Sequence, residues 1–80
     1  MPRFYFDVRQ GSNLIPDPEG FECASLEAAE HEAMQTALQL GRDALAHSRH
    51  LSVEVKNERY QPVLAVTIGL TIERLAPWLG

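Results

Sequence analysis

One segment of this chain, residues 26–47, carries apolar residues at helical spacing, and no second segment does. The stripe consists mostly of small side chains and comprises Leu26, Ala29, Ala33, Ala37, Leu40 and Ala44. Met34, Leu38 and Leu45 widen it, and we expect Leu26, Met34 and Leu40 to meet the sheet together with the alanines. Ser25 precedes it and can accept a hydrogen bond from a backbone N–H of the first turn, so we expect the helix to begin at Leu26 and to end near His47. A lone helix cannot bury its own apolar stripe, so it must lie across a sheet.

The segments on both sides of this helix alternate between apolar and polar residues, which is the pattern of half-buried strands. Residues 3–9 place three apolar side chains on one face, and residues 51–56 do the same after the helix. Residues 64–72 hold the longest unbroken alternation in the chain. Short strands are also expected at residues 14–15 and 21–23, before the helix.

The predicted fold is therefore α+β with the order ββαββ: one long helix packed across one face of a small, mostly antiparallel sheet. The first half of the strand at 64–72 is apolar on both faces, as in an interior strand. We therefore favour the strand order second–first–fourth–third, with the fully antiparallel order second–first–third–fourth as the alternative. Eighty residues, 45% of them apolar, support one small core, so residues 1–80 are expected to form a single domain.

The C-terminal segment, residues 70–80, is predicted to be an association element. The strand at 64–72 is longer than the strand at 3–9, so its end should overhang the sheet. An exposed apolar edge is prone to pairing unless something covers it. The expected interface is a set of apolar side chains: Leu70, Ile72, Leu75, Trp78 and Leu79. A two-fold homodimer is the simplest arrangement, and the alternative is that the segment folds back over the bare face of its own sheet.

Composition limits the other classes of function. The net charge is −4, from 7 basic and 11 acidic residues, which opposes nonspecific binding to nucleic acid. One cysteine cannot form an internal disulfide or a cysteine zinc site. No apolar run approaches the length of a membrane span and the N-terminus lacks the apolar stretch of a signal peptide, so a cytoplasmic location without membrane association is expected.

The side chains capable of chemistry do not converge in the sequence. Cys23 lacks a neighbour that would activate it and is expected to be a small buried hydrophobic residue. His31 belongs to the solvated side of the helix, whereas His47 and His50 flank its end, so three ligands for zinc are not brought together. We therefore expect no catalytic residue, no metal and no cofactor.

Two polar features have an alternative interpretation. Asp17, Glu19 and Glu22 form an acidic loop, which lacks the dense series of oxygen ligands of a calcium site and is expected to be a solvated turn. Tyr5 lies on the outer sheet face among arginines, an arrangement that can stack on single-stranded nucleic acid. The acidic net charge argues against that second function.

The residues from Met1 to Arg9, then Gly11, then Asp17 to Gly20, then Ser25 to Ala29, resemble a family of short bacterial proteins that open Met-Pro-Arg-Tyr-Phe-Phe with His or Asp before Val. The resemblance extends to about Val66. That family is a domain of unknown function, so the resemblance implies a fold and no activity. The chain after Ile68 is longer and more apolar than the family's usual ending.

A weaker similarity links the strands before Ser25 and the alanine-rich helix to the N-terminal half of HicB-type antitoxins. It implies a small toxin as partner, although the basic DNA-binding segment typical of those proteins has no counterpart here. From the residues and these resemblances together, we expect a non-enzymatic protein-interaction module that forms a homo-oligomer. The alternatives are an antitoxin-like partner of a small toxin and a weak single-stranded nucleic-acid binder.

Overall fold

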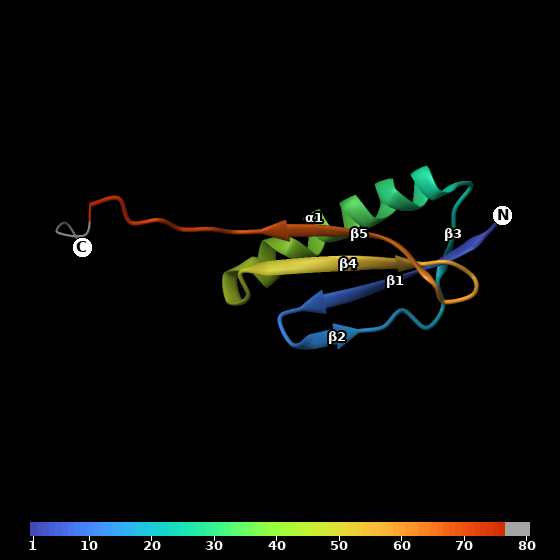
Figure 1. Cartoon of the computed structure of the whole chain (residues 1–80), viewed down its shortest axis with the longest axis horizontal. Coiled ribbons are helices and arrows are strands. Elements are labelled where there is room, and N and C mark those ends of the chain that lie inside the picture. The colour runs from blue at the N-terminus through green and yellow to red at the C-terminus, as the bar shows by residue number, and fades with distance from the viewer. Residues whose placement is uncertain (77–80) are drawn as a thin grey trace.

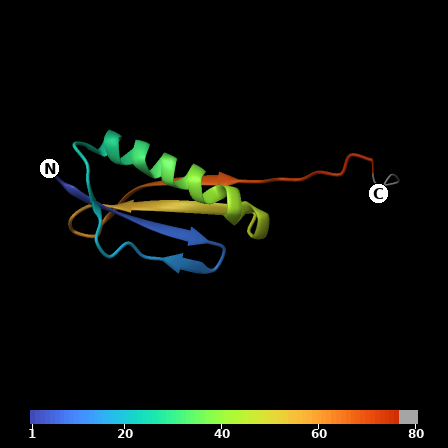
Figure 2. The same cartoon turned by 180° about the vertical axis from the view of Figure 1, so that it is seen from behind.

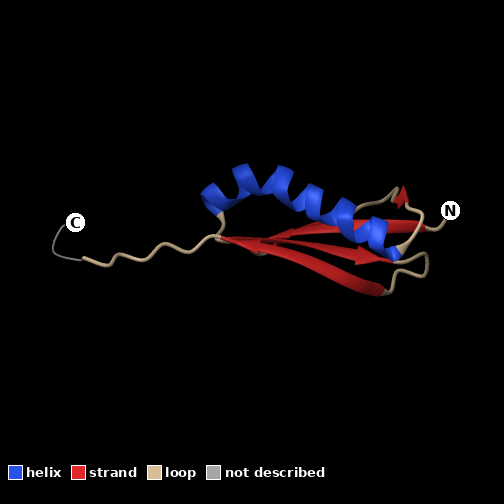
Figure 3. Cartoon of the chain, turned by 90° about the horizontal axis from the view of Figure 1, so that it is seen from above, coloured by secondary structure: helices blue, strands red, loops and turns tan. Residues whose placement is uncertain are grey.

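The computed structural model describes residues 1–76 and contains one helix and a single open sheet (Figure 1). In chain order its elements are β1 (Arg3–Gln10), β2 (Asn13–Ile15), β3 (Phe21–Glu22), α1 (Leu26–His47), β4 (His50–Lys56) and β5 (Pro62–Gly69). All strand pairs are antiparallel, and α1 lies across one face of the sheet (Figure 3). The predicted α+β fold, with one helix on one face of a small sheet, is confirmed.

The strand order is β2-β1-β4-β5, with β3 paired to the start of β1. The favoured order, which placed the last strand beside the first, is wrong, and the fully antiparallel alternative is correct. A tight loop explains the difference: the Asn57 N–H donates to the Gln61 carbonyl at 3.0 Å and the Tyr60 N–H to the Asn57 carbonyl at 2.9 Å. This loop returns the chain directly along β4, so β5 becomes the edge strand despite its apolar residues.

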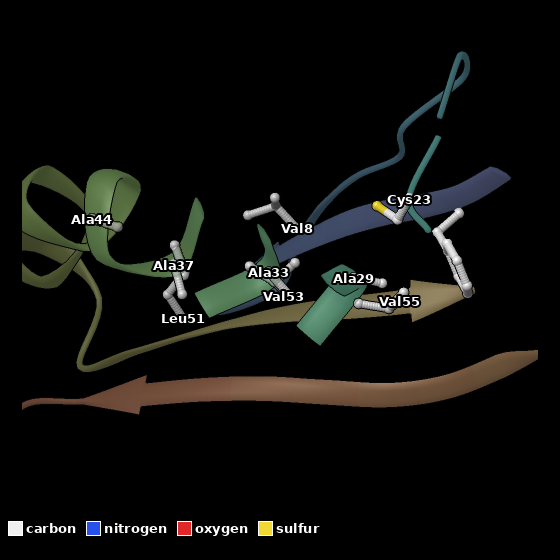
Figure 4. Packing of buried hydrophobic residues seen from close by; sticks show 10 residues of the cluster. Val8, Cys23, Ala29, Ala33, Ala37, Ala44, Leu51, Val53 and Val55 are labelled. Atoms are coloured by element: carbon white, nitrogen blue, oxygen red, sulfur yellow. The ribbon is translucent and has the colours of Figure 1, made fainter. Parts of the chain in front are cut away.

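Small side chains allow α1 to pack closely on the sheet. The Ser25 hydroxyl accepts a hydrogen bond from the Ala28 N–H at 3.1 Å, which fixes the start of the helix where the sequence predicts it. The buried helix residues are all small: Ala29, Ala33, Ala37, Gly41 and Ala44. Figure 2 shows α1 in front of the sheet, and Figure 4 shows the alanines facing the β4 side chains.

The larger apolar residues of α1 lie outside this contact. Leu26, Met34 and Leu40 were expected to meet the sheet, and all three are exposed. The alanine stripe brings the helix backbone so near the strands that bulkier neighbours can only flank the interface. The expectation that they belong to the core is therefore wrong.

The core lies between the alanine stripe and the central strands. Leu51, Val53 and Val55 of β4 are completely buried, and Phe4 and Val8 of β1 are nearly so. Partly buried apolar residues extend this cluster: Phe6, Leu64, Val66 and Ile68.

The paired part of β5 ends earlier than the alternation in the sequence. The last hydrogen bond that holds β5 to the neighbouring chain is donated by the Leu70 N–H to the carbonyl of Arg49 at 2.8 Å. Arg49 directly precedes the first residue of β4, His50, so β4 offers no partner to residues after Leu70. Residues 70–76 continue away from the body of the protein in line with β5 (Figures 1 and 2). The predicted overhang is therefore present, and over residues 70–76 the chain does not fold back onto the open face of its sheet.

Candidate functional site

β5 presents one row of backbone groups that no strand within residues 1–76 pairs with. Hydrogen-bonded pairs alternate along an antiparallel ladder, and the Leu70 N–H is bonded to the Arg49 carbonyl. β4 and β5 keep a single register over most of their length. The N–H and C=O groups of Ala65, Thr67 and Gly69 must therefore point outward, away from β4.

The two edges of the sheet differ in how they are protected. Natural edge strands are blunted by shortness, by proline, by charged side chains or by bulges. β2 has three residues and is followed by Pro16 and Pro18. β5 has eight residues with its only proline at the first position, and no charged residue occurs from Pro62 to Ile72. The β5 edge is thus long, uncharged and open.

The predicted interface residues that the structure describes are exposed on the tail, defined here as residues 70–76. The exposed fraction rises along it, from 42% at Leu70 to 67% at Ile72 and 85% at Leu75. Trp78 and Leu79, the other two predicted interface residues, lie outside the described residues. Within the described residues, nothing covers the apolar side chains of the tail.

An apolar flank on α1 accompanies the open edge. A side chain added at Gly41 would meet Ile68 of β5 and Leu45, so this side of the helix lies next to β5. Met34, Leu38 and Leu45 occupy the same side of the helix as Gly41, because they are spaced from it by whole turns. Met34 and Leu38 are exposed, and sequence analysis did not identify this helix flank as part of a surface shared with β5.

Asp7 is a buried carboxylate on the sheet face away from α1, the face that the sequence predicted to be bare. Its exposed fraction is 6%, and the Lys56 Nζ lies 2.9 Å from its Oδ2. Burial alone would raise the pKa of Asp7. The hydrogen bond from Lys56, the backbone N–H of Asp17 and the lysine charge together outweigh burial, so the pKa of Asp7 lies below its ordinary value.

Asp17 organises the loop that covers Asp7. The Asp17 N–H donates to Asp7 Oδ1 at 3.0 Å, and Asp17 Oδ2 accepts from the Phe6 N–H at 3.1 Å. Phe6 lies between the parts of β1 that pair with β2 and β3, so Asp17 replaces the missing strand partner. The other oxygen, Oδ1, accepts from the N–H groups of Glu19 and Gly20. The expected solvated turn is in fact a structural bridge, recognisable from the Asp-x-x-Gly spacing of a turn closed by a side chain.

Tyr5 and Tyr60 stack on the same open face, with ring centroids 4.6 Å apart. Tyr60 has a φ of 60°, which is uncommon for a bulky residue, and the Asn57 side chain holds the loop around it by accepting from the N–H groups of Arg59 and Gln61. The neighbouring Tyr60 side chain, chiefly through its hydroxyl group, raises the pKa of Tyr5 above its ordinary value. The pair covers part of the open face, which the sequence predicted to be bare.

The remaining reactive side chains are separated. Cys23 is buried as predicted, and burial, with Glu32 nearby, raises the pKa of its thiol and keeps it protonated. His31 lies on the exposed side of α1, whereas His47 ends the helix and His50 begins β4. Within residues 1–76 no three His, Cys, Asp or Glu side chains are grouped so as to hold a metal ion. No helix over the same residues combines the length and apolar character needed to cross a membrane.

The surface hollows lie along the C-terminal half of α1. The larger is lined by Leu38, Gln39, Arg42 and Asp43, and a neighbouring one reaches from Gln39 and Asp43 to His47 and Gln10. Most of these side chains are exposed, so both hollows are depressions on the helix surface rather than enclosed clefts.

The fold and the open edge together define a small α+β protein with one helix on one face of an antiparallel sheet. A family model described as a domain of unknown function, DUF6894, matches residues 3–69, which include all six elements. The chain therefore belongs to the DUF6894 family. The match ends where β5 ends, so the tail lies beyond it. Neither a search of curated proteins nor one of solved structures finds a significant match to the chain.

Proposed function

We propose that this protein is a non-enzymatic interaction module that associates with itself as a homodimer through β5 and the residues that follow it. The observation that carries the proposal is the conjunction of an open, uncharged edge strand with an apolar extension in line with it. The interface side chains would be those predicted from the sequence, namely Leu70, Ile72, Leu75, Trp78 and Leu79.

Elementary energetics support association. Burial of apolar surface stabilises by roughly 25 cal/mol per Å², and the tail leaves Ile72 and Leu75 mostly in water. Backbone groups at an open edge gain direct hydrogen bonds when a further strand is added. A second copy of the chain brings an edge of the same kind, with no charged residue from Pro62 to Ile72 to repel it.

The nucleic-acid alternative is less well supported. Two of the open-face cations near Tyr5 already have partners: Arg3 donates to the Glu19 carbonyl at 2.8 Å, and Lys56 pairs with Asp7. The net charge of −4 also opposes a polyanion. The antitoxin-like alternative predicts a separate small protein as partner, which the following experiment would reveal as a heteromeric complex.

The test is the mass of the purified full chain by size-exclusion chromatography with light scattering. We expect a dimer, and we expect Ile72→Ser to shift the equilibrium toward the monomer because it removes apolar surface from the tail. Leu14→Ser is the matched control, since Leu14 is an exposed residue on β2, the opposite edge of the sheet. A full chain that remains monomeric at high concentration, or a Leu14→Ser effect equal to that of Ile72→Ser, would contradict the proposal.

A further inference from the structure

We propose that the dimer forms by reciprocal strand addition, in which the tail of each copy pairs antiparallel with β5 of the other. This inference rests on the proposed self-association and specifies its geometry. It makes β5 and the tail, residues 62–76, one continuous strand that pairs with its own copy across a two-fold axis.

The direction of the backbone groups supports this pairing. Ala65, Thr67 and Gly69 direct their N–H and C=O groups outward, as derived from the Leu70–Arg49 bond. Continued in extended form, the tail presents the same groups of Thr71 on the same side. One ladder can therefore run along both segments without a break in its hydrogen-bonding pattern.

The side chains of β5 and the tail also support the antiparallel pairing of the two copies. Leu64, Val66 and Ile68 face α1, and by alternation Leu70 and Ile72 lie on that same face of the extended strand. A two-fold axis perpendicular to the sheet keeps both helices on one face. The tail of one copy would then pass beneath the apolar flank of the other copy's helix, where Met34 and Leu38 are exposed. Two sets of exposed apolar side chains would cover each other.

The junction between β5 and the tail selects a register. If each tail pairs only with β5 of the other copy, the two-fold axis lies at Gly69, the last residue of β5, so that Gly69 is opposite Gly69 of the second copy and Thr67 is opposite Thr71. The charged residues Glu73 and Arg74 then lie opposite uncharged β5 residues, so no like charges face each other across the ladder.

Cysteine cross-linking tests this register. In a Cys23→Ala background, Gly69→Cys should form an intermolecular disulfide on mild oxidation, because directly opposed residues lie within disulfide reach. A side chain at Gly69 meets only the Arg49 carbonyl, at 3.6 Å, so the substitution fits the monomer. Thr67→Cys is the matched control and should remain uncross-linked, since the two copies of this residue would be several residues apart along the ladder.

A backbone substitution tests the ladder itself. Thr71→Pro removes one backbone N–H from the tail of each copy, so the symmetric dimer loses two hydrogen bonds. Its dissociation constant should rise by about tenfold or more. Thr71→Ala keeps the N–H and should associate nearly as the unmodified chain does. The measurement is the dissociation constant from sedimentation velocity.

The outcomes separate the two proposals. If the full chain dimerises but neither Gly69→Cys nor Thr67→Cys cross-links, or if Thr71→Pro dimerises as well as Thr71→Ala, reciprocal strand addition is wrong while self-association stands. Cross-linking through Thr67→Cys instead of Gly69→Cys contradicts the register. A monomeric full chain removes the proposed function and this inference together.

Discussion

Ile68 of β5 fills the space that a side chain on Gly41 of α1 would need, so the helix and the edge strand meet without an intervening β-carbon. A glycine inside a helix costs roughly 1 kcal/mol relative to alanine. Close approach is therefore the reason for Gly41, whereas the sequence alone favoured a simple weak point in the helix. The contact anchors β5 to the body of the protein and leaves its other edge open.

The first prediction tests this contact. Gly41→Ala should destabilise the protein by about 1 kcal/mol, because displacing the Ile68 δ-methyl group outweighs the gain in helix propensity. In an Ile68→Val background that methyl group is absent, and the same change should stabilise by about 0.5–1 kcal/mol. Urea unfolding of the unmodified protein, the two single variants and the double variant measures the coupling free energy between residues 41 and 68. An equal effect of Gly41→Ala in both backgrounds would show that the two residues do not compete for space.

The second prediction tests the assignment of the sheet faces with two valines. Val53 is completely buried under α1, whereas Val63 is 37% exposed at the β5 edge. Val53→Ala should lower the free energy of unfolding by about 1–3 kcal/mol, through lost burial and a residual cavity. Val63→Ala should cost less than about 1 kcal/mol by the same reasoning. Chemical denaturation of both variants provides the comparison, and similar losses would mean that the open face is covered in solution.

The third prediction concerns acid stability. The pKa of Asp7 lies below its ordinary value, so the folded state favours the ionised carboxylate. Its contribution should be complete above the unfolded-state pKa of about 4 and should be lost as the pH falls below that value. Asp7→Asn should cost about 1–3 kcal/mol at pH 7, since it removes a hydrogen-bonded ion pair with Lys56.

The same variant supplies the control for pH. The stability difference between the unmodified protein and Asp7→Asn should shrink as the pH is lowered from 5 to 3, approximate limits set by the ordinary pKa of aspartate. Urea unfolding at several pH values measures it. A constant difference over that range would assign the loss to packing rather than to the charge of Asp7.

The sequence predicted the elements more fully than their arrangement. Serine capping and the alanine stripe correctly predict the helix from Leu26 to His47, and alternation predicts the three long strands β1, β4 and β5. The strand order was missed because apolar residues on both faces are typical of an interior strand, whereas β5 carries them at the edge of the sheet. The hairpin loop at 57–61 was the better guide, since it forces neighbouring antiparallel strands.

The hydrogen bonds between Asp7 and Asp17 could not be predicted from the alternation of apolar and polar residues, for a different reason. Alternation assigns Asp7 to the face away from the helix, which is correct, but it does not show what covers that face. The cover comes from Asp17, a residue distant in sequence whose carboxylate substitutes for a strand. For the candidate site, the tail residues were predicted from their apolarity, whereas the flank formed by Met34 and Leu38 required knowledge of how the helix is rotated on the sheet.

The fourth prediction uses the single tryptophan of the chain as a reporter. Trp78 belongs to the C-terminal segment predicted to associate, so its environment should become less polar in the dimer. Its fluorescence emission should shift to longer wavelength on dilution, over the same concentration range in which the mass falls. Ile72→Ser should move that range to higher concentration. Emission that stays constant while the mass changes would exclude Trp78 from the interface.

The most direct test of self-association is sedimentation equilibrium of the unmodified 80-residue chain from low to high micromolar concentration. Our account predicts a mass that rises with concentration toward twice the 9.0 kDa of one chain and then levels off, as expected for a closed two-fold dimer. A mass that remains at that of one chain throughout the range would contradict it.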